Sequence, residues 1–277
     1  MRFSNYLLFF LISISILSCS KDKLKETVIK EKNLNLQVLE AYKEGKEALD
    51  GGDVLFAAKK FNEAEMLFPQ SEWAPKSALM AAYSYYTQDF YENTIAELKR
   101  FLRIYPKHKN VDYAYYLLGL SYYEQIVDEK KDLSSIMNAK NTFEYIISEF
   151  PNTEYAMDSE FKIELINDII ASKEIYIGRY YQSKKKWIAA INRYRTIVDY
   201  YNTTIYIEEA LHRLVEIYYI IGLESEASKY AQLLGYNYQS SKWYEQTYMV
   251  FDKTYKQKKI ILKKKNSKLQ KIKSLFE

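Results

Sequence analysis

Turn-forming residues are scarce in this chain of 277 residues, which holds seven glycines and four prolines. Folds built from many short strands need frequent turns, and turn dipeptides such as Asn-Gly are few here. A phosphate-binding loop also needs glycine, and almost none is left over for one. Because hydrophobic residues still make up 48% of the chain, the composition favours an all-α fold.

Histidine and cysteine are equally rare. The two histidines, His108 and His212, have no metal-ligand spacing, so we expect both at the surface or at helix ends. The only cysteine is Cys19, so no internal disulfide can form. The acidic pair Glu208-Glu209 occupies adjacent helix positions, and we interpret it as part of a solvated face. The sequence therefore predicts neither an enzyme nor a metal or cofactor site.

The chain does contain a repeated set of small and aromatic residues. In the first copy Gly45 is followed by Ala57, then by Phe61 and Pro69. This spacing is typical of the tetratricopeptide repeat, a pair of antiparallel helices. Four further copies follow the same order: Ala82, Thr94, Leu98, Phe101 and Pro106; Gly119, Ala139, Phe143, Ile146 and Pro151; Gly178, Ala190, Tyr194, Ile197 and Asn202; Gly222, Ala227, Ala231 and Leu234.

The repeated residues have a physical role in helix packing. Small side chains let two helices approach closely, the aromatic side chain fills the space beside them, and proline ends the second helix. One pair cannot bury its apolar face alone, so the pairs stack and leave a concave surface. We predict an all-α, right-handed superhelix (α-solenoid) of five tetratricopeptide-like helix pairs, with a polar insertion at 128–134 and an amphipathic stretch at 153–171.

The N-terminus has the features of an exported lipoprotein. The apolar run at 6–17 is too short to span a bilayer, which needs roughly 20 residues, so residues 1–18 are predicted to be a signal peptide. The sequence Ile16-Leu17-Ser18-Cys19 resembles a bacterial lipobox. We expect a diacylglycerol and an N-acyl chain such as palmitate on Cys19, the alternative being an unpaired thiol. The following Ser20 resembles lipoproteins sent to the outer membrane, and residues 19–35 are interpreted as a flexible tether.

The C-terminal extension, residues 251–277, is strongly basic. From 252 to 277 ten lysines face two acids, a local charge of +8, so the remaining residues carry 4 minus 8, or −4. Nucleic acid is not expected as a partner, because the chain is exported. The apolar residues recur at helical spacing, which predicts a basic amphipathic helix on an anionic lipid surface or an acidic partner. The alternative is a solvated extension.

Tyrosine is unusually frequent, with 29 residues, many of them in adjacent pairs. Adjacent helix positions point about 100° apart, so one ring of each pair can enter the core while the other faces a groove. These rings are either core and boundary aromatics or, in part, the lining of a peptide-binding face.

The residues between the repeat positions carry a more specific resemblance. It rests on these segments: Ser71–Tyr83, Tyr105–His108, Asp112–Leu117, Gly119–Gln125, Phe150–Ala156, Lys173–Glu174, Gly178–Tyr181, Ala189–Tyr194 and Glu208–Glu216. In order and spacing they resemble the BamD family, lipoproteins of the outer-membrane β-barrel assembly (BAM) complex. The resemblance implies a non-enzymatic scaffold on the periplasmic face of the outer membrane, with roles in the insertion of β-barrel proteins.

The same resemblance implies which partners each half meets. The N-terminal repeats, 36–152, are expected to receive unfolded outer-membrane proteins. The C-terminal repeats, 153–250, are expected to dock the membrane-proximal periplasmic domain of the central barrel subunit, and accessory BAM lipoproteins are further expected partners.

Specific site residues follow from the resemblance. Docking is assigned to Arg193 together with Asn192 and Arg213, although Arg193 could instead form an intramolecular ion pair. The residues expected in the peptide pocket are Phe68, Tyr83, Tyr86, Tyr113 and Tyr116.

Two other functions fit the same repeats. One is a different periplasmic tetratricopeptide lipoprotein that coordinates cell-wall or division factors. The other is a repeat domain attached to a periplasmic hydrolase.

Overall fold

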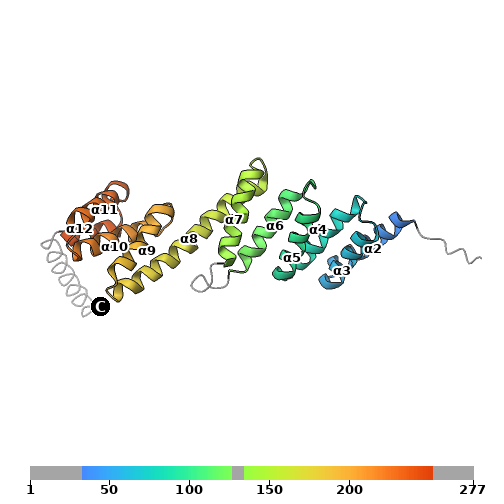
Figure 1. Cartoon of the computed structure of the whole chain (residues 1–277), viewed down its shortest axis with the longest axis horizontal. Helices are drawn as coiled ribbons and strands as arrows, with labels where there is room; N and C mark the ends of the chain where they lie inside the picture. Colours follow the sequence, from blue (N-terminus) through green and yellow to red (C-terminus); the bar gives the residue numbers. More distant parts are fainter. Residues whose placement is uncertain (1–32, 127–133, 252–277) are drawn as a thin grey trace, which may run out of the picture.

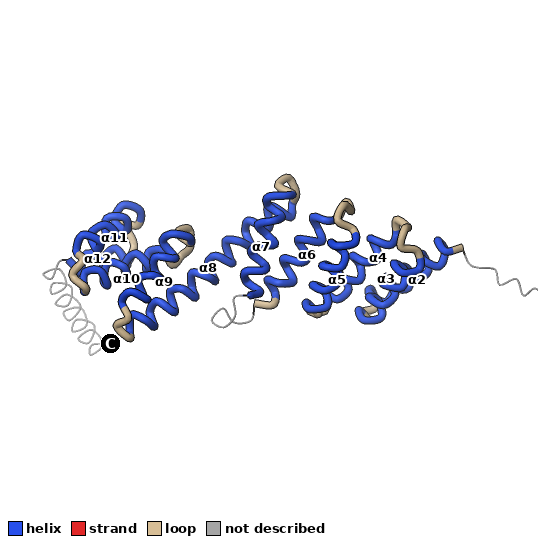
Figure 2. Tube along the Cα trace, in the orientation of Figure 1, coloured by secondary structure: helices blue, strands red, loops and turns tan. Residues whose placement is uncertain are grey.

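The computed structural model describes residues 33–126 and 134–251, and within them the chain is entirely helical, without a strand (Figure 2). The eleven described helices are α2 (Leu34–Asp50), α3 (Val54–Leu67), α4 (Trp73–Tyr86), α5 (Tyr91–Ile104), α6 (Val111–Glu124), α7 (Ser134–Glu149), α8 (Glu154–Ser183), α9 (Trp187–Tyr200), α10 (Ile207–Ile220), α11 (Glu224–Asn237) and α12 (Lys242–Phe251). The predicted signal peptide, Cys19, and nearly all of the tether, the insertion and the basic extension lie outside the described residues.

The helices form one elongated row in which each packs on the next (Figure 1). This arrangement confirms the predicted all-α solenoid of tetratricopeptide-like pairs. Across the described ranges no helix combines the length and the apolar character that crossing a membrane requires.

The repeated glycine lies where two helices approach most closely. A Cβ atom added at Gly119 would lie 2.7 Å from the Phe143 ring, and one at Gly45 would lie 3.0 Å from the Phe61 ring. At Gly178 the added atom would overlap Tyr194. The small-residue and aromatic positions of the repeat are therefore direct packing partners, as the spacing predicts.

The longest helix corrects one detail of the predicted organisation. We expected an amphipathic stretch at 153–171 followed by a separate fourth repeat, but α8 runs unbroken for 30 residues. Thr153 caps its start by accepting a hydrogen bond from the Ala156 amide at 3.2 Å. The first half of α8 packs on α7, and α8 also packs on α9 as the first helix of the fourth pair.

Two main hydrophobic cores meet on α8. Ile166 and Ile170 belong to the core of the preceding repeats, whereas Ala171 and Ile175 belong to the core shared with α9–α12. Helix α8 thus joins the two halves of the molecule. We place the boundary between the halves at residues 170 and 171, where the buried side chains of α8 pass from the first core to the second.

Candidate peptide-binding and partner-binding sites

A cavity of about 440 Å³ lies among the first helices of the first three pairs. Helix α2 contributes one residue, α4 contributes four on one face, and the start of α6 with its preceding loop contributes three. The lining residues are Tyr42, Lys76, Leu79, Met80, Tyr83, Lys109, Asn110 and Tyr113. Its volume lies within the range of typical ligand pockets.

Three tyrosines, one from each of the three helices, line this cavity beside Leu79 and Met80. The Tyr42 ring packs edge-on against Trp73 and Phe61, with centroids 4.9 and 5.2 Å apart. Burial raises the pKa of Tyr113 to about 12, from an ordinary value of 10 at which the phenol is already neutral at physiological pH. Neutral, partly buried tyrosines offer an apolar surface with a polar tip, which suits a bound peptide.

The charges that line the cavity are positive. The Lys76 ammonium lies 4.9 Å from the centroid of the Trp73 ring, and Lys109 is exposed. Both lysines are close enough to His108 that their charges, added to the larger effect of burial, lower its pKa. No carboxylate is among the described residues that line the cavity, so the cavity combines apolar walls with an excess of positive charge.

The structure separates the five residues predicted for the peptide pocket. Tyr83 and Tyr113 line the cavity. Phe68 packs on a small apolar cluster between α2 and α3, and Tyr86 packs edge-on against a tyrosine of α5. Tyr116 donates a hydrogen bond to an aspartate of α8 at 2.7 Å. A peptide-binding role for the last three stays a prediction that this geometry does not support directly.

Six of the eight lining residues were missed by the sequence reasoning, and they include Tyr42, Lys76 and Lys109. A signal for Lys76 was present, because residues 76, 79, 80 and 83 have the spacing of one helix face. Tyr42 and Lys109 had no local signal, since they meet that face only when three repeats stack.

Arg193, the predicted docking residue, forms an ion pair within the chain. Its Nη1 atom lies 3.2 Å from both carboxylate oxygens of the buried Glu174 on α8. The Arg193 side chain is nevertheless 42% exposed, and it lines a depression of about 230 Å³ with Asn192 and Thr196. The intramolecular pair and an accessible guanidinium therefore coexist.

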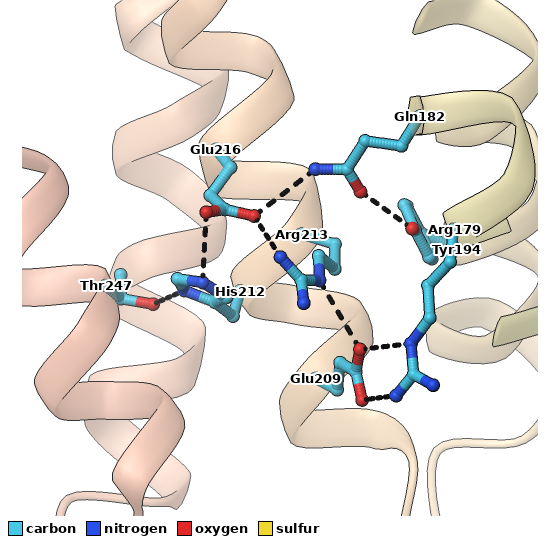
Figure 3. Close-up of polar contacts among 8 residues, drawn as sticks. All are labelled: Arg179, Gln182, Tyr194, Glu209, His212, Arg213, Glu216 and Thr247. Atoms are coloured by element: carbon cyan, nitrogen blue, oxygen red, sulfur yellow. Dashed lines mark hydrogen bonds and ion pairs between the residues drawn. The ribbon is translucent and has the colours of Figure 1, made fainter. Parts of the chain in front are cut away.

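Arg213 belongs to a different and more buried set of contacts (Figure 3). Its guanidinium donates to Glu209 at 3.4 Å and to Glu216 at 2.7 Å, and it lies over the Trp243 ring. Glu209 also accepts two hydrogen bonds from Arg179 of α8. These contacts connect α8 with α10, so the structure gives Arg213 an intramolecular role.

His212 extends the same network to α12. Its Nδ1 lies 2.8 Å from the Thr247 hydroxyl, and its Nε2 lies 3.4 Å from Glu216 (Figure 3). Burial opposes the charged form of Glu216, but hydrogen bonds and charge from His212 and Arg213 outweigh it and lower the pKa of Glu216 to about 2. We refer to Arg179, Glu209, His212, Arg213, Glu216 and Thr247 as the polar network.

Two expectations about single residues are wrong. His212 was expected at the surface or at a helix end, but it is 2% exposed in the middle of α10. Glu209 was interpreted as part of a solvated face, but it is buried because two arginines neutralise it. One partner of each lies 30 or more residues away along the chain, Arg179 for Glu209 and Thr247 for His212, whereas Arg213 and Glu216 lie four residues away on the same helix. No group of three or more possible metal ligands occurs among the residues that the structure describes.

The sequence of the chain is similar to those of known proteins. Residues 35–233 match the family described as "YfiO: Outer membrane lipoprotein". The chain is 45% identical over 207 residues to the outer membrane protein assembly factor BamD of Rickettsia prowazekii, covering 75% of this chain and 82% of that protein. Identity to BamD of Caulobacter vibrioides is 36% over 242 residues, covering 87% and 78%.

Among solved structures, the TPR2AB domain of yeast Sti1 aligns over 85% of this chain and 88% of that one, with 13% identity and a TM-score of 0.41. The match over residues 35–233 spans more than half of the chain, and two curated assembly factors align over most of its length. The chain therefore belongs to the BamD (YfiO) family of outer-membrane lipoproteins.

Proposed function

We propose that this chain is a non-enzymatic subunit of the outer-membrane β-barrel assembly machinery, anchored by lipid at Cys19 on the periplasmic face. Its first repeats receive unfolded outer-membrane proteins, and its later repeats dock the central barrel subunit, with accessory lipoproteins as further partners. The observation that carries the substrate role is the cavity shared by α2, α4 and α6, which combines aromatic walls with two lysines.

The cavity chemistry favours the free C-terminal end of a client chain. An aromatic side chain can pack against Tyr83 and Tyr113, while the terminal carboxylate meets Lys76 and Lys109. Burying an aromatic side chain of about 150–250 Å² at roughly 25 cal/mol per Å² supplies about 4–6 kcal/mol before the ordering of the peptide is subtracted. The net affinity is then modest, as release of the client to the barrel subunit requires.

The docking role rests on the accessible guanidinium of Arg193. Both of its contacts to Glu174 use Nη1. Nη2 and Nε have no hydrogen-bond partner among the described residues, so both are available for a carboxylate from a partner, which an arginine can bind through two parallel hydrogen bonds. Asn192 is exposed beside it and adds a polar group to the same surface.

Co-purification from detergent-solubilised envelopes tests this function. The tagged lipoprotein is expected to recover a barrel protein with tandem periplasmic domains, and Arg193→Glu is expected to abolish that recovery while helicity stays unchanged. The exposed Arg195, which pairs only with Asp199 among the described residues, offers a matched control in Arg195→Glu. Recovery of cell-wall or division proteins without a barrel protein would contradict the proposal.

A further inference from the structure

The first half of α8 presents an apolar stripe to solvent. Met157, Phe161 and Leu165 are 61%, 66% and 49% exposed. Their spacing of four places them along one face of the helix, and we call these three residues the α8 stripe. Clustered exposed side chains of this size are typical of an interaction surface rather than of a solvated helix.

The helix around the α8 stripe is acidic. Between 154 and 168 the chain has five acids and one lysine, a net charge of −4. Glu154, Glu160 and Glu164 are exposed. Neither Glu160 nor Glu164 forms an ion pair with any described residue. The surface therefore fits a partner that is both apolar and basic.

One segment of this same chain has that chemistry. Residues 252–277 carry ten lysines and two acids, and Leu262, Leu269, Ile272 and Phe276 follow one another at spacings of seven, three and four. This spacing places the four apolar residues on one face when the segment is helical, with lysines on both sides. The segment begins directly after Phe251, the last residue of α12.

We propose that residues 252–277 dock on the α8 stripe of the same molecule, with apolar residues in contact and lysines beside Glu160 and Glu164. The stripe lies about 27–39 Å along α8 from Ser183, at 1.5 Å per residue. With residues 262–276 helical, residues 252–261 can span up to about 33 Å when extended, and the helical part adds about 22 Å. The segment starts at α12, which packs on α10, which in turn connects through α9 to α8; its combined reach of about 55 Å exceeds the length of α8 between Ser183 and the stripe. This docking is independent of the client cavity.

The sole native cysteine makes the test direct. In the full mature chain with Cys19→Ser, the substitution Gln270→Cys creates the only thiol, which is labelled with benzophenone maleimide and irradiated. The expected adducts join the label to residues 154–168 of the same chain, read by mass spectrometry of the monomer band. Adducts confined to a dimer band would show docking on a second copy, and both that result and the absence of α8 adducts would overturn the proposal.

Substitutions on α8 sharpen this test. Phe161→Ser is expected to lower the α8 adduct yield roughly fivefold, because it removes apolar contact area. Glu160→Lys with Glu164→Lys is expected to lower it by a similar factor at low salt, and the difference should shrink as salt screens the charges. Ile188→Ser, which alters a residue of α9 that is also exposed, is the matched control and should leave the yield unchanged. If the control lowers the yield as much as Phe161→Ser, docking is not specific to the stripe.

Discussion

The two halves of the molecule share one repeat register but place their charges differently. In the first half the buried ion pair lies between second helices, where Arg100 of α5 binds Glu65 of α3. The first helices α2, α4 and α6 are left to form the cavity with its lysines. In the second half the polar network lies on the first helices α8 and α10 and extends to α12. The corresponding face is thus open for a ligand in one half and cross-linked in the other.

This difference shows how repeats that pack alike can acquire separate roles. Packing requires only the small and aromatic positions, so the polar positions of each copy are free to change. In the second half the first helices are joined by buried charge, whereas the cavity of the first half presents Lys76 and Lys109, which form no ion pair with any residue that the structure describes.

The largest expected loss of stability comes from a substitution that breaks the polar network. Glu209→Ala leaves Arg179 and Arg213 without their shared carboxylate, and we expect a loss of about 2–3 kcal/mol in the free energy of unfolding. Urea unfolding followed by circular dichroism measures it. The adjacent Glu208→Ala is the control, expected to change stability by less than about 0.5 kcal/mol. Equal losses in both variants would show that the network does not stabilise the second half.

As the pH falls, we expect the second half of the molecule to lose stability before the first half. The pKa of Glu216 is lowered from its ordinary 4.5 to about 2. Between these two pH values the carboxylate is protonated in the unfolded chain but still ionised in the folded chain. Stability present above pH 4.5 is therefore lost as the pH falls towards 2, by about 2 kcal/mol after allowance for partial exposure.

Tryptophan fluorescence can locate that loss. The Trp243 ring packs at a tilt against His212 in the second half, with ring centroids 5.2 Å apart, and Trp73 lies in the first half. In variants that keep one tryptophan each, the signal of Trp243 should change at higher pH than that of Trp73. Glu216→Gln should remove the difference, and a simultaneous change of both signals would contradict this account.

Because both halves share the repeat register, the same Gly→Ala substitution should lower the free energy of unfolding by a similar amount in each half. Gly119→Ala and Gly178→Ala each force a Cβ atom into an aromatic ring, and each is expected to destabilise the chain by about 1–2 kcal/mol after the gain in helix propensity. Gly235→Ala, where the nearest ring atom is 3.1 Å away at the edge of Tyr244, should cost less. Thermal unfolding gives the comparison, and a stabilised Gly119→Ala would contradict the packing argument.

The smallest effect on stability is expected at the cavity. Lys109 is exposed, so Lys109→Glu should change the free energy of unfolding by less than about 0.5 kcal/mol. A larger loss in urea unfolding would mean that this lysine supports the fold, and its assignment to a ligand would weaken.

The fold was more predictable from the sequence than the sites were. Gly119 and Phe143 revealed a helix contact because their partners recur at fixed spacing. The unbroken α8 was missed because the repeat spacing was weighed above the lack of any proline or glycine between Thr153 and Gly178. The contact of His212 with Thr247 and the position of Lys109 beside the α4 face of the cavity arise only when the repeats stack, and no local pattern records them.

The central claim is that the first half binds clients and the second half docks the barrel subunit. It is tested most directly by measuring both activities on two variants of the full chain: binding of a fluorescent peptide with a C-terminal aromatic residue, and co-purification of the barrel subunit. We predict that Lys76→Glu with Lys109→Glu abolishes peptide binding and keeps co-purification, while Arg193→Glu does the reverse. Loss of both activities in either variant, or of neither, would contradict the claim.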